Sequence, residues 1–247
     1  MTSPTPGTTE AEPVERALVI VAHPDDVDFG AAGTIATWTA EGIEVTYAIC
    51  TNGDAGGFDP AVPRSEIGGI RQDEQRAAAL EVGVKDVRFL NYPDGQLAPS
   101  FELRRDLSRV IRQVRPQRLV MQSPEINWER IPASHPDHRA AGEAALCAVY
   151  PDARNPFTHT TLLQDEALGA WTVRDVWVMV AGQGANRWVD VTDTFGQKVA
   201  ALRQHASQTS HMPDLEGMLR GWLGANAVAG GLPEGRLAES FRVVSIP

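Results

Sequence analysis

The stretch that decides the fold is ALVIVAHPDDVDFGAAGTIATWTAEG, residues 17–42. Its first six residues form a continuous apolar run, which is typical of a buried β-strand, and residues 30–42 place apolar residues at helical spacing before a glycine. The turn between them contains His23, Pro24 and three closely spaced aspartates. Carboxylates this close repel one another unless a cation lies among them, so the turn is a candidate metal site.

The alternation of apolar strand and amphipathic helix continues along the chain. Further strands are predicted over 44–50, 87–91, 118–122, 175–180 and 187–192, and further helices over 64–83, 100–116, 135–150 and 193–207. The remaining C-terminal residues are interpreted as a Gly-rich amphipathic tail. The pattern predicts an α/β protein with a mostly parallel sheet that is covered by helices on both faces. In such folds, ligands bind outside the carboxyl ends of the strands.

Composition and charge limit the kinds of partner. A chain of 247 residues with 43% hydrophobic residues can bury one large core, so residues 17–247 are predicted to form a single domain. Residues 1–16 are polar and rich in Pro and Thr, which predicts a disordered tail and no signal peptide. The net charge of -10 disfavours nucleic acid and anionic membranes, and it favours a small ligand that is neutral or cationic overall.

The sequence gives no sign of a membrane segment. No apolar run reaches the ~20 residues that a membrane-spanning helix needs. A cytoplasmic protein without a membrane partner is therefore predicted. The oligomeric state is left open, and a homo-oligomer is compatible with the sequence.

Two clusters of histidine and aspartate occur at predicted strand ends. In the first cluster, His23 and Asp26 lie three positions apart in one turn, a spacing that lets both side chains bind one ion. In the second cluster, SHPDH, His135 and His138 lie three positions apart at a helix start, so both fall on about the same face. Together the two clusters predict one metal site.

The number of candidate ligands suits a catalytic zinc site. Such a site takes three protein ligands and keeps the fourth position for water. His23, Asp26 and one of the two later histidines would supply the three ligands. Asp25 and the remaining histidine would then supply what an amide hydrolase needs, which is a base for the metal-bound water and a donor for the developing oxyanion.

The two motifs together resemble those of a known family. AHPDD after the first strand and HPDH at a later helix start are similar to motifs of the LmbE-like or PIG-L family of zinc-dependent N-acetylglucosaminyl deacetylases. The similarity runs from about residue 17 to about residue 210. It implies a Rossmann-like, three-layer fold. It also implies these roles: zinc ligands His23, Asp26 and His138, general base Asp25, and oxyanion partner His135.

The resemblance extends to two more positions and fails at another. Arg71 and Asp94 match positions that face sugar hydroxyls in the family, so both are predicted to contact the substrate. The family motif usually continues as HPDDE, whereas this chain has Val27 and then Asp28. Whether Asp28 takes over the role of the missing glutamate is left open, as is the role of His205.

The predicted function is that of a zinc-dependent hydrolase that removes the N-acetyl group from an N-acetylglucosamine-type amino sugar or its conjugate. A metal-dependent phosphoesterase, or an amidase on another small conjugate, is the main alternative, and Arg71 and Arg139 are available to bind a phosphoryl group. A non-catalytic, Rossmann-like dinucleotide-binding module is disfavoured. Its first turn should carry glycines that receive pyrophosphate, whereas the turn here carries aspartates that would repel it.

Overall fold

The computed structural model describes residues 13–180 and 184–246. The predicted tail over 1–16 lies outside the described residues as far as residue 12, and Arg16 already belongs to the first strand. The strands are β1 (Arg16–Val21), β2 (Glu44–Thr51), β3 (Asp86–Tyr92), β4 (Arg118–Gln122), β5 (Asp175–Met179), β6 (Arg187–Asp190) and β7 (Ala238–Ser245).

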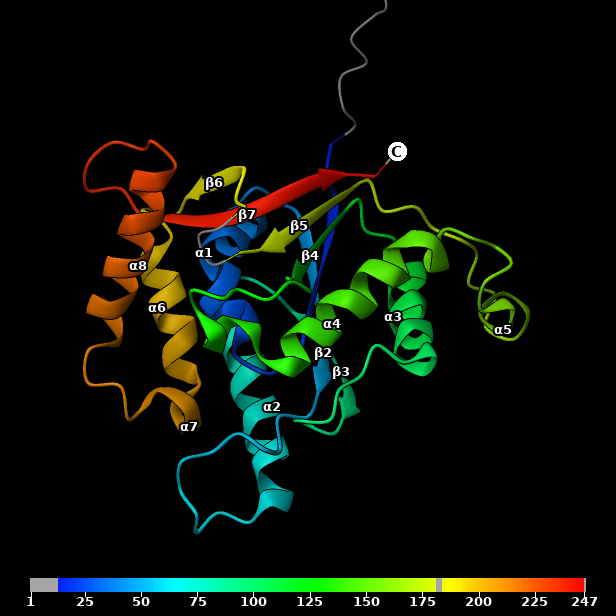
Figure 1. Ribbon diagram of the computed structural model, residues 1–247, viewed down its shortest axis with the longest axis horizontal. Helices are drawn as coiled ribbons and strands as arrows, with labels where there is room; N and C mark the ends of the chain where they lie inside the picture. Colours follow the sequence, from blue (N-terminus) through cyan, green and yellow to red (C-terminus); the bar gives the residue numbers. More distant parts are fainter. Residues whose placement is uncertain (1–12, 181–183, 247) are drawn as a thin grey trace, which may run out of the picture.

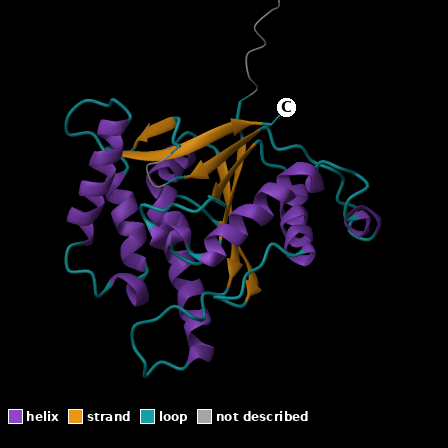
Figure 2. Ribbon diagram, viewed as in Figure 1, coloured by secondary structure: helices purple, strands orange, loops and turns teal. Residues whose placement is uncertain are grey.

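Within the described residues, these strands form one seven-stranded sheet in the order β3-β2-β1-β4-β5-β7-β6. Strands β3, β2, β1, β4 and β5 pair in parallel, whereas β7 runs antiparallel to both of its neighbours, β5 and β6. Figure 2 shows the strands gathered in one central layer between helices. The predicted mostly parallel sheet is therefore confirmed.

Helices cover both faces of the sheet. They are α1 (Asp26–Ala40), α2 (Arg64–Glu81), α3 (Phe101–Val114), α4 (Pro136–Cys147), α5 (Thr160–Gln164), α6 (Phe195–Gln204), α7 (Ala206–Thr209) and α8 (Leu215–Ala229), with irregular turns η1 (Ile131–Ser134) and η2 (Ala148–Ala153). Figure 1 shows α1, α2, α6 and α8 on one side of the sheet and α3 and α4 on the other. The described helices include none with the length and apolar character that crossing a membrane requires.

The two faces of β1 explain the three layers. Leu18 and Ile20 belong to a buried cluster with residues of α3 and α4, whereas Val19 and Val21 belong to a second cluster with residues of α1 and α2. Because successive side chains of a strand point to opposite faces, a strand that is buried on both faces reads as a continuous apolar run. This is the run with which the sequence ALVIVA begins.

The first helix begins earlier than predicted. We expected it from residue 30, but α1 starts at Asp26, so Asp26 and Asp28 lie in its first turn. The backbone carbonyl of Asp25 accepts hydrogen bonds from the N–H groups of Asp28 (2.9 Å) and Phe29 (3.0 Å), which closes that turn. Carboxylates are favoured at this end because the helix dipole is positive there.

The C-terminal part was only partly predicted. The expected amphipathic tail consists of α7, α8 and strand β7, and β7 was missed. Its sequence, AESFRVVS, lacks a clear apolar pattern because two polar residues, Glu239 and Ser240, are buried in it. Both side chains have hydrogen-bond partners inside the protein, which makes their burial possible. A reading of the sequence that assigns polar residues to the surface therefore misses this strand.

Candidate active site

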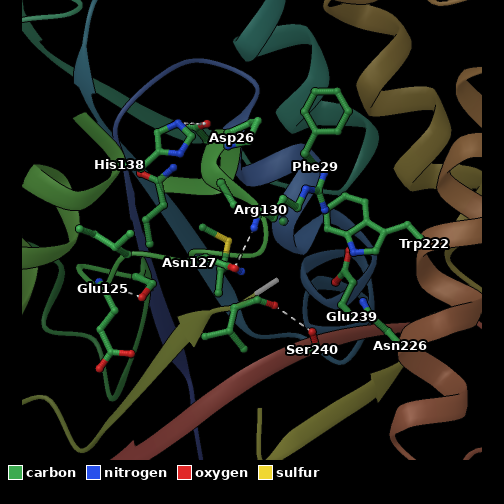
Figure 3. Close-up of a pocket in the computed structure, with 18 of the residues that line it drawn as sticks. Asp26, Phe29, Glu125, Asn127, Arg130, His138, Trp222, Asn226, Glu239 and Ser240 are labelled. Atoms are coloured by element: carbon green, nitrogen blue, oxygen red, sulfur yellow. Dashed lines mark hydrogen bonds and ion pairs between the residues drawn. The ribbon is translucent and has the colours of Figure 1, made fainter. Parts of the chain in front are cut away.

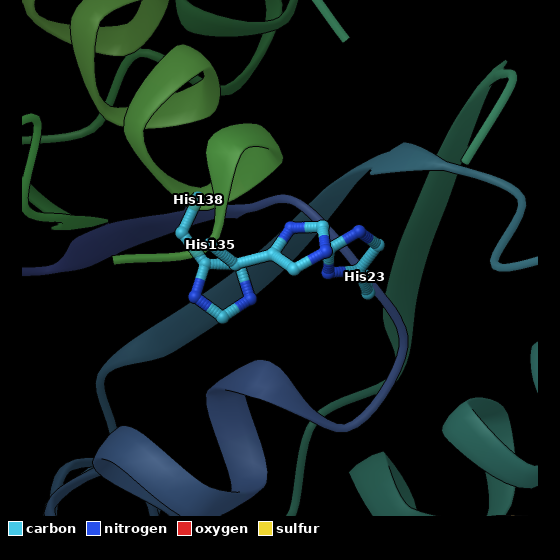
Figure 4. Close-up of side chains that lie close together, drawn as sticks. All are labelled: His23, His135 and His138. Atoms are coloured by element: carbon cyan, nitrogen blue, oxygen red, sulfur yellow. The ribbon is translucent and has the colours of Figure 1, made fainter. Parts of the chain in front are cut away.

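The parallel strands bring the predicted site residues to one edge of the sheet. His23 follows β1, Asp94 follows β3, and the loop after β4 leads to His135 and His138 at the start of α4. The carboxyl ends of parallel strands lie at the same edge, so these residues meet although the chain separates them. Figure 4 shows the three histidines close together above the start of α1.

Asp26 links two of the histidines. Its Oδ2 lies 3.3 Å from His23 Nδ1, and its Oδ1 lies 3.0 Å from His138 Nε2. Ring nitrogens of His23, His135 and His138 also lie within 4.8 Å of one another. The two clusters predicted from sequence therefore form one group, which could hold a metal ion.

The second ring nitrogen of His23 is held by two further carboxylates. His23 Nε2 lies 3.0 Å from Asp94 Oδ1 and 3.2 Å from Asp137 Oδ2. Asp137 is itself fixed, because it accepts hydrogen bonds from the backbone N–H groups of Gly95 (2.7 Å) and Leu97 (3.2 Å). Metal-binding histidines commonly donate their other N–H to a carboxylate in this way, which fixes the ring orientation.

The electrostatics of the centre favour a cation. Burial disfavours the charged form of His23, but Asp137, Asp26 and Asp94 outweigh this effect and raise the pKa of His23 to about 12. Likewise, burial lowers the pKa of His138, but Asp26 outweighs it and the net shift is upward. Carboxylates that stabilise positive charge on imidazole would also stabilise a divalent ion between the rings.

The number of carboxylates around the centre also favours a bound cation. Four aspartates surround it, Asp25, Asp26, Asp94 and Asp137, and Arg71 forms ion pairs with two of them, at 3.1 Å to Asp25 and 3.6 Å to Asp94. One guanidinium does not balance four carboxylates, so the remaining positive charge has to come from protonated histidines or from a bound cation in their place. Imidazole nitrogens and a carboxylate oxygen form a donor set that suits metal ions such as zinc. The residues therefore fit a His/Asp metal site.

Asp25 lies beside this group in an unusual backbone conformation. Its φ is 89°, a region that residues other than glycine rarely adopt, and such strain is typically found at functional sites. Its backbone N–H donates to Gln75 Oε1 (2.8 Å), and its Oδ2 accepts from Arg71 Nη2 (3.1 Å). Burial raises the pKa of Asp25 to about 6, although Arg71 acts in the opposite direction.

Arg71 and Asp94 are both buried, with 4% and 7% exposure. Arg71 donates to the backbone carbonyls of Gly53 (3.0 Å) and Pro24 (2.7 Å) as well as to Asp25, so it braces the turn that carries the site. Asp94 contacts His23 and Arg71. Their predicted contacts with substrate remain predictions, and the structure adds a supporting role for both side chains.

His135 is the most accessible of the three histidines. It is exposed at the N-cap of α4, where its Nδ1 accepts a hydrogen bond from the backbone N–H of Asp137 (3.2 Å). Burial, together with the charges of His23 and His138, lowers the pKa of His135. Because Nδ1 is an acceptor here, the proton of the neutral ring is assigned to Nε2, which can donate to a ligand.

Asp28, which follows Val27 where the chain departs from the usual motif, is held by side chains from two other parts of the chain. Asp28 is fully buried, and its Oδ2 lies 2.8 Å from both Gln75 Nε2 and His205 Nε2. Gln75 also holds the backbone of Asp25, so Asp28 connects the site to α2 and to the end of α6. Val27 instead packs in the apolar core. The described structure thus gives His205 a partner in the buried carboxylate of Asp28.

A buried ion pair between Lys198 and Glu239 holds the backbone of α1. Lys198 Nζ donates to the backbone carbonyls of Asp28 (2.8 Å) and Phe29 (2.6 Å) and to Glu239 Oε1 (2.7 Å). Glu239 in turn accepts from the backbone N–H groups of Gly33 (3.0 Å) and Thr34 (2.8 Å). This network joins α1, α6 and β7, and we predicted none of it from the sequence.

A cavity of about 300 Å³ opens beside the metal-site residues. Asp26 and His138 line it, so it is continuous with the candidate centre (Figure 3). Its other walls include side chains of the loop after β4 and of α8: Glu125, Ile126, Asn127, Arg130, Trp222, Leu223 and Asn226. The site thus has a ligand-sized space next to its chemical groups.

The chain has a three-layer α/β fold with a histidine–aspartate centre at the carboxyl edge of its sheet. It therefore belongs to the class of α/β proteins with a candidate metal-dependent active site. The family model PIG-L, described as GlcNAc-PI de-N-acetylase, matches residues 18–149. The chain belongs to this family. The predicted family is therefore confirmed.

Relatives agree with this membership. The diacetylchitobiose deacetylase of Thermococcus kodakarensis is 33% identical over 79% of this chain and 70% of its own length. A probable N-acetyl-alpha-D-glucosaminyl L-malate deacetylase 2 of Bacillus cereus is 32% identical over 80% of this chain and 85% of its own length. The solved N,N'-diacetylchitobiose deacetylase of Pyrococcus horikoshii superposes with a TM-score of 0.85 at 31% identity, covering 94% of this chain and 84% of that one. These relatives are named as deacetylases of N-acetylglucosamine-type compounds, in agreement with the predicted activity.

Proposed function

We propose that this protein is a zinc-dependent N-deacetylase that hydrolyses the acetamide of an N-acetylglucosamine-type sugar or conjugate. The observation that carries the proposal is the buried contact of Asp26 with both His23 and His138, with Asp25 beside it and His135 at its exposed side. Family membership and the names of the relatives support the same activity.

In this proposal His23, Asp26 and His138 hold the zinc. His135 is left out of the ligand set because its Nδ1 is occupied by the N–H of Asp137 and because it is the most exposed of the histidines. When bound, zinc supplies Lewis acidity, which polarises the amide carbonyl and makes water a stronger acid. Asp137 and Asp94 keep the His23 ring in the orientation that a ligand needs.

Asp25 is assigned the role of general base. Its carboxylate receives the proton of the attacking water and then delivers it to the nitrogen of the leaving amine. A pKa of about 6 leaves it ionised at neutral pH, yet basic enough to take up a proton. Arg71 and Gln75 hold the side chain and the backbone of Asp25, which limits the movement of the base.

His135 is assigned to the oxyanion. Its Nε2–H would donate to the carbonyl oxygen of the amide, where negative charge builds up as water attacks. The backbone N–H of Asp137 fixes the ring through Nδ1, so the donor is oriented before the substrate arrives. A donor placed this way stabilises the transition state more than the ground state.

The substrate is proposed to be a small N-acetylated sugar or glycoconjugate, with Arg71 and Asp94 as predicted contacts for its hydroxyl groups. The phosphoesterase alternative is less well supported. Both terminal nitrogens of Arg71 already donate to protein groups, so this arginine keeps a single donor for a hydroxyl but no free donor pair to clamp a phosphoryl group.

The test is an acetate-release assay on the zinc-loaded protein with N-acetylated sugars, disaccharides and pseudo-disaccharides. We expect acetate from at least one of them, about one zinc per chain, and loss of activity with a chelator. Release of phosphate from a sugar phosphate, with no acetate from any N-acetyl sugar, would favour the phosphoesterase. Activity that persists after complete metal removal would exclude the zinc mechanism.

A further inference from the structure

The cavity beside the centre contains an arginine without a carboxylate partner. Arg130 lies in the loop between β4 and α4, and its guanidinium carbon lies over the Trp222 ring of α8, 5.0 Å from the ring centroid. Figure 3 shows the Arg130 side chain beside the Trp222 indole, with Phe29 also nearby. Across the described residues, Arg130 forms no ion pair with a carboxylate.

The acids near Arg130 do not cancel its charge. Glu239 lines the cavity, but its two oxygens are already bonded to Lys198 and to the backbone N–H groups of α1. Glu125 also lines the cavity, and Figure 3 shows its carboxylate directed away from Arg130. Glu129, the preceding residue, is exposed and forms no ion pair with Arg130 in the described part of the chain. Arg130 is therefore an uncompensated positive charge at the cavity wall.

Among the described residues, only the backbone N–H of Arg130 donates a hydrogen bond, which leaves its guanidinium able to bind an anion. The planar N–H donors of a guanidinium match the two oxygens of a carboxylate or phosphate. Arg130 is itself exposed, and apolar side chains that include Met179 and Leu223 line the same cavity. A ligand that fills the cavity would cover the contact and strengthen a charge-assisted bond.

The position of the cavity indicates which part of a substrate would reach Arg130. Asp26 and His138 belong both to the cavity wall and to the candidate centre. A sugar whose acetamide lies at the centre can therefore extend its substituent into the cavity. A volume of about 300 Å³ is at the lower end for ligand pockets and fits a small substituent.

We propose that Arg130 binds a carboxylate or phosphate on the aglycone of the substrate, so that the enzyme prefers anionic N-acetylglucosamine conjugates to neutral ones. This inference rests on the proposed deacetylase function. It departs from the neutral or cationic ligand expected from the net charge of -10, because an unpaired guanidinium in the cavity acts at contact distance. Among the relatives, the Bacillus cereus protein is named for a malate conjugate and the Thermococcus protein for diacetylchitobiose, so substituents of different charge occur.

The experiment uses three glycosides of N-acetylglucosamine that differ mainly in charge, with glycerol, glycerate and glycerol phosphate as aglycones. We expect the higher kcat/KM with one or both charged aglycones, and the better of the two identifies the oxyanion as carboxylate or phosphate. Arg130→Met should lower the ratio of charged to neutral kcat/KM by about 10- to 100-fold, mainly through KM, because this contact is made in both the ground state and the transition state. Arg130→Lys should keep part of the ratio, since it keeps the charge but not the planar donor pair.

The matched control is Arg115→Met, which removes another arginine that stacks on a tryptophan, Trp171 (4.5 Å), and that does not line the cavity. It should leave the ratio unchanged. If Arg130→Met lowers kcat/KM equally for all three glycosides, Arg130 only fastens the loop, and the inference is wrong. An enzyme that prefers the glycerol glycoside would also overturn it. Acetate from none of the three glycosides or of the wider panel would overturn the proposed function and this inference together.

Discussion

The two halves of the sheet contribute different things to the site. Strands β1 to β4 are parallel, and the segments that follow them supply all the proposed ligands and the proposed base. The part from β5 onward has mixed strand directions and supplies Lys198, His205, Glu239 and Trp222, which support α1 or line the cavity. The family model covers 18–149, which is the first part. The proposed ligands and base thus belong to short sequence motifs. The residues that hold α1 in place and complete the cavity come from distant segments of the chain.

The largest effect is expected from removing a proposed ligand in the first half. His138→Ala should lose most of its zinc and its measurable activity, because two remaining ligands do not make the usual catalytic set of three. Metal analysis of the purified variant, together with the acetate assay, checks both expectations.

His135→Ala is the matched variant for His138→Ala, since both remove one imidazole from the same helix start. It should keep its zinc and lose about 10²–10³-fold in kcat, the usual loss for one oxyanion donor. Should His135→Ala emerge without metal while His138→Ala keeps it, the two assignments must be exchanged.

Replacing the proposed base is expected to leave the zinc content unchanged and to lower kcat strongly. Asp25→Asn should retain zinc but lose about 10²–10⁴-fold in kcat, because the amide cannot accept the proton of water. Single-turnover measurements on the zinc-loaded variant separate this loss from slow product release. Near-normal turnover would reassign the base, and Glu125 or Glu129 would be the next candidates.

Substitutions in the second half, from β5 onward, are expected mainly to lower the free energy of unfolding. Lys198→Met leaves Glu239 buried with no cation, and breaking a buried pair typically lowers the free energy of unfolding by about 3–5 kcal/mol. Urea unfolding measures this change, and Lys85→Met, at an exposed position, is the control that should change it little. Adding Glu239→Gln should recover part of the loss. If Lys198→Met is as stable as the parent, Lys198 does not support α1 in the way described.

The sequence predicted the elements and side chains that belong to short, local patterns. The apolar run of β1 and the two histidine motifs sufficed for the fold class and for the residues that meet at the centre. The start of α1 was placed too late, because residues 26–29 carry two charged side chains that a helical apolar pattern does not include. Asp137 was missed although it lies inside HPDH, since an acid that contacts a buried histidine has the same appearance in sequence as a surface acid.

Long-range pairs were the part that could not be predicted. His205 and Asp28 are 177 positions apart, and nothing in either segment identifies the other as its partner. The same holds for Lys198 and Glu239, whose burial makes sense only once α1, α6 and β7 are packed together. A buried charge in an otherwise unremarkable strand such as β7 is a feature that periodicity cannot reveal.

The hydrogen bonds between Glu239 and the backbone of α1 also have a consequence for folding during synthesis on the ribosome. Gly33 and Glu239 are 206 positions apart, and ribosomes add about 5–20 residues per second, so roughly 10–40 s pass between the synthesis of the two partners. During that interval the helix that begins at Asp26 has no β7 to bind, and Lys198, once it is made, has no carboxylate until Glu239 follows 41 positions later. The motif that defines the family is translated early, but its final alignment has to wait for a strand near the other end of the described chain.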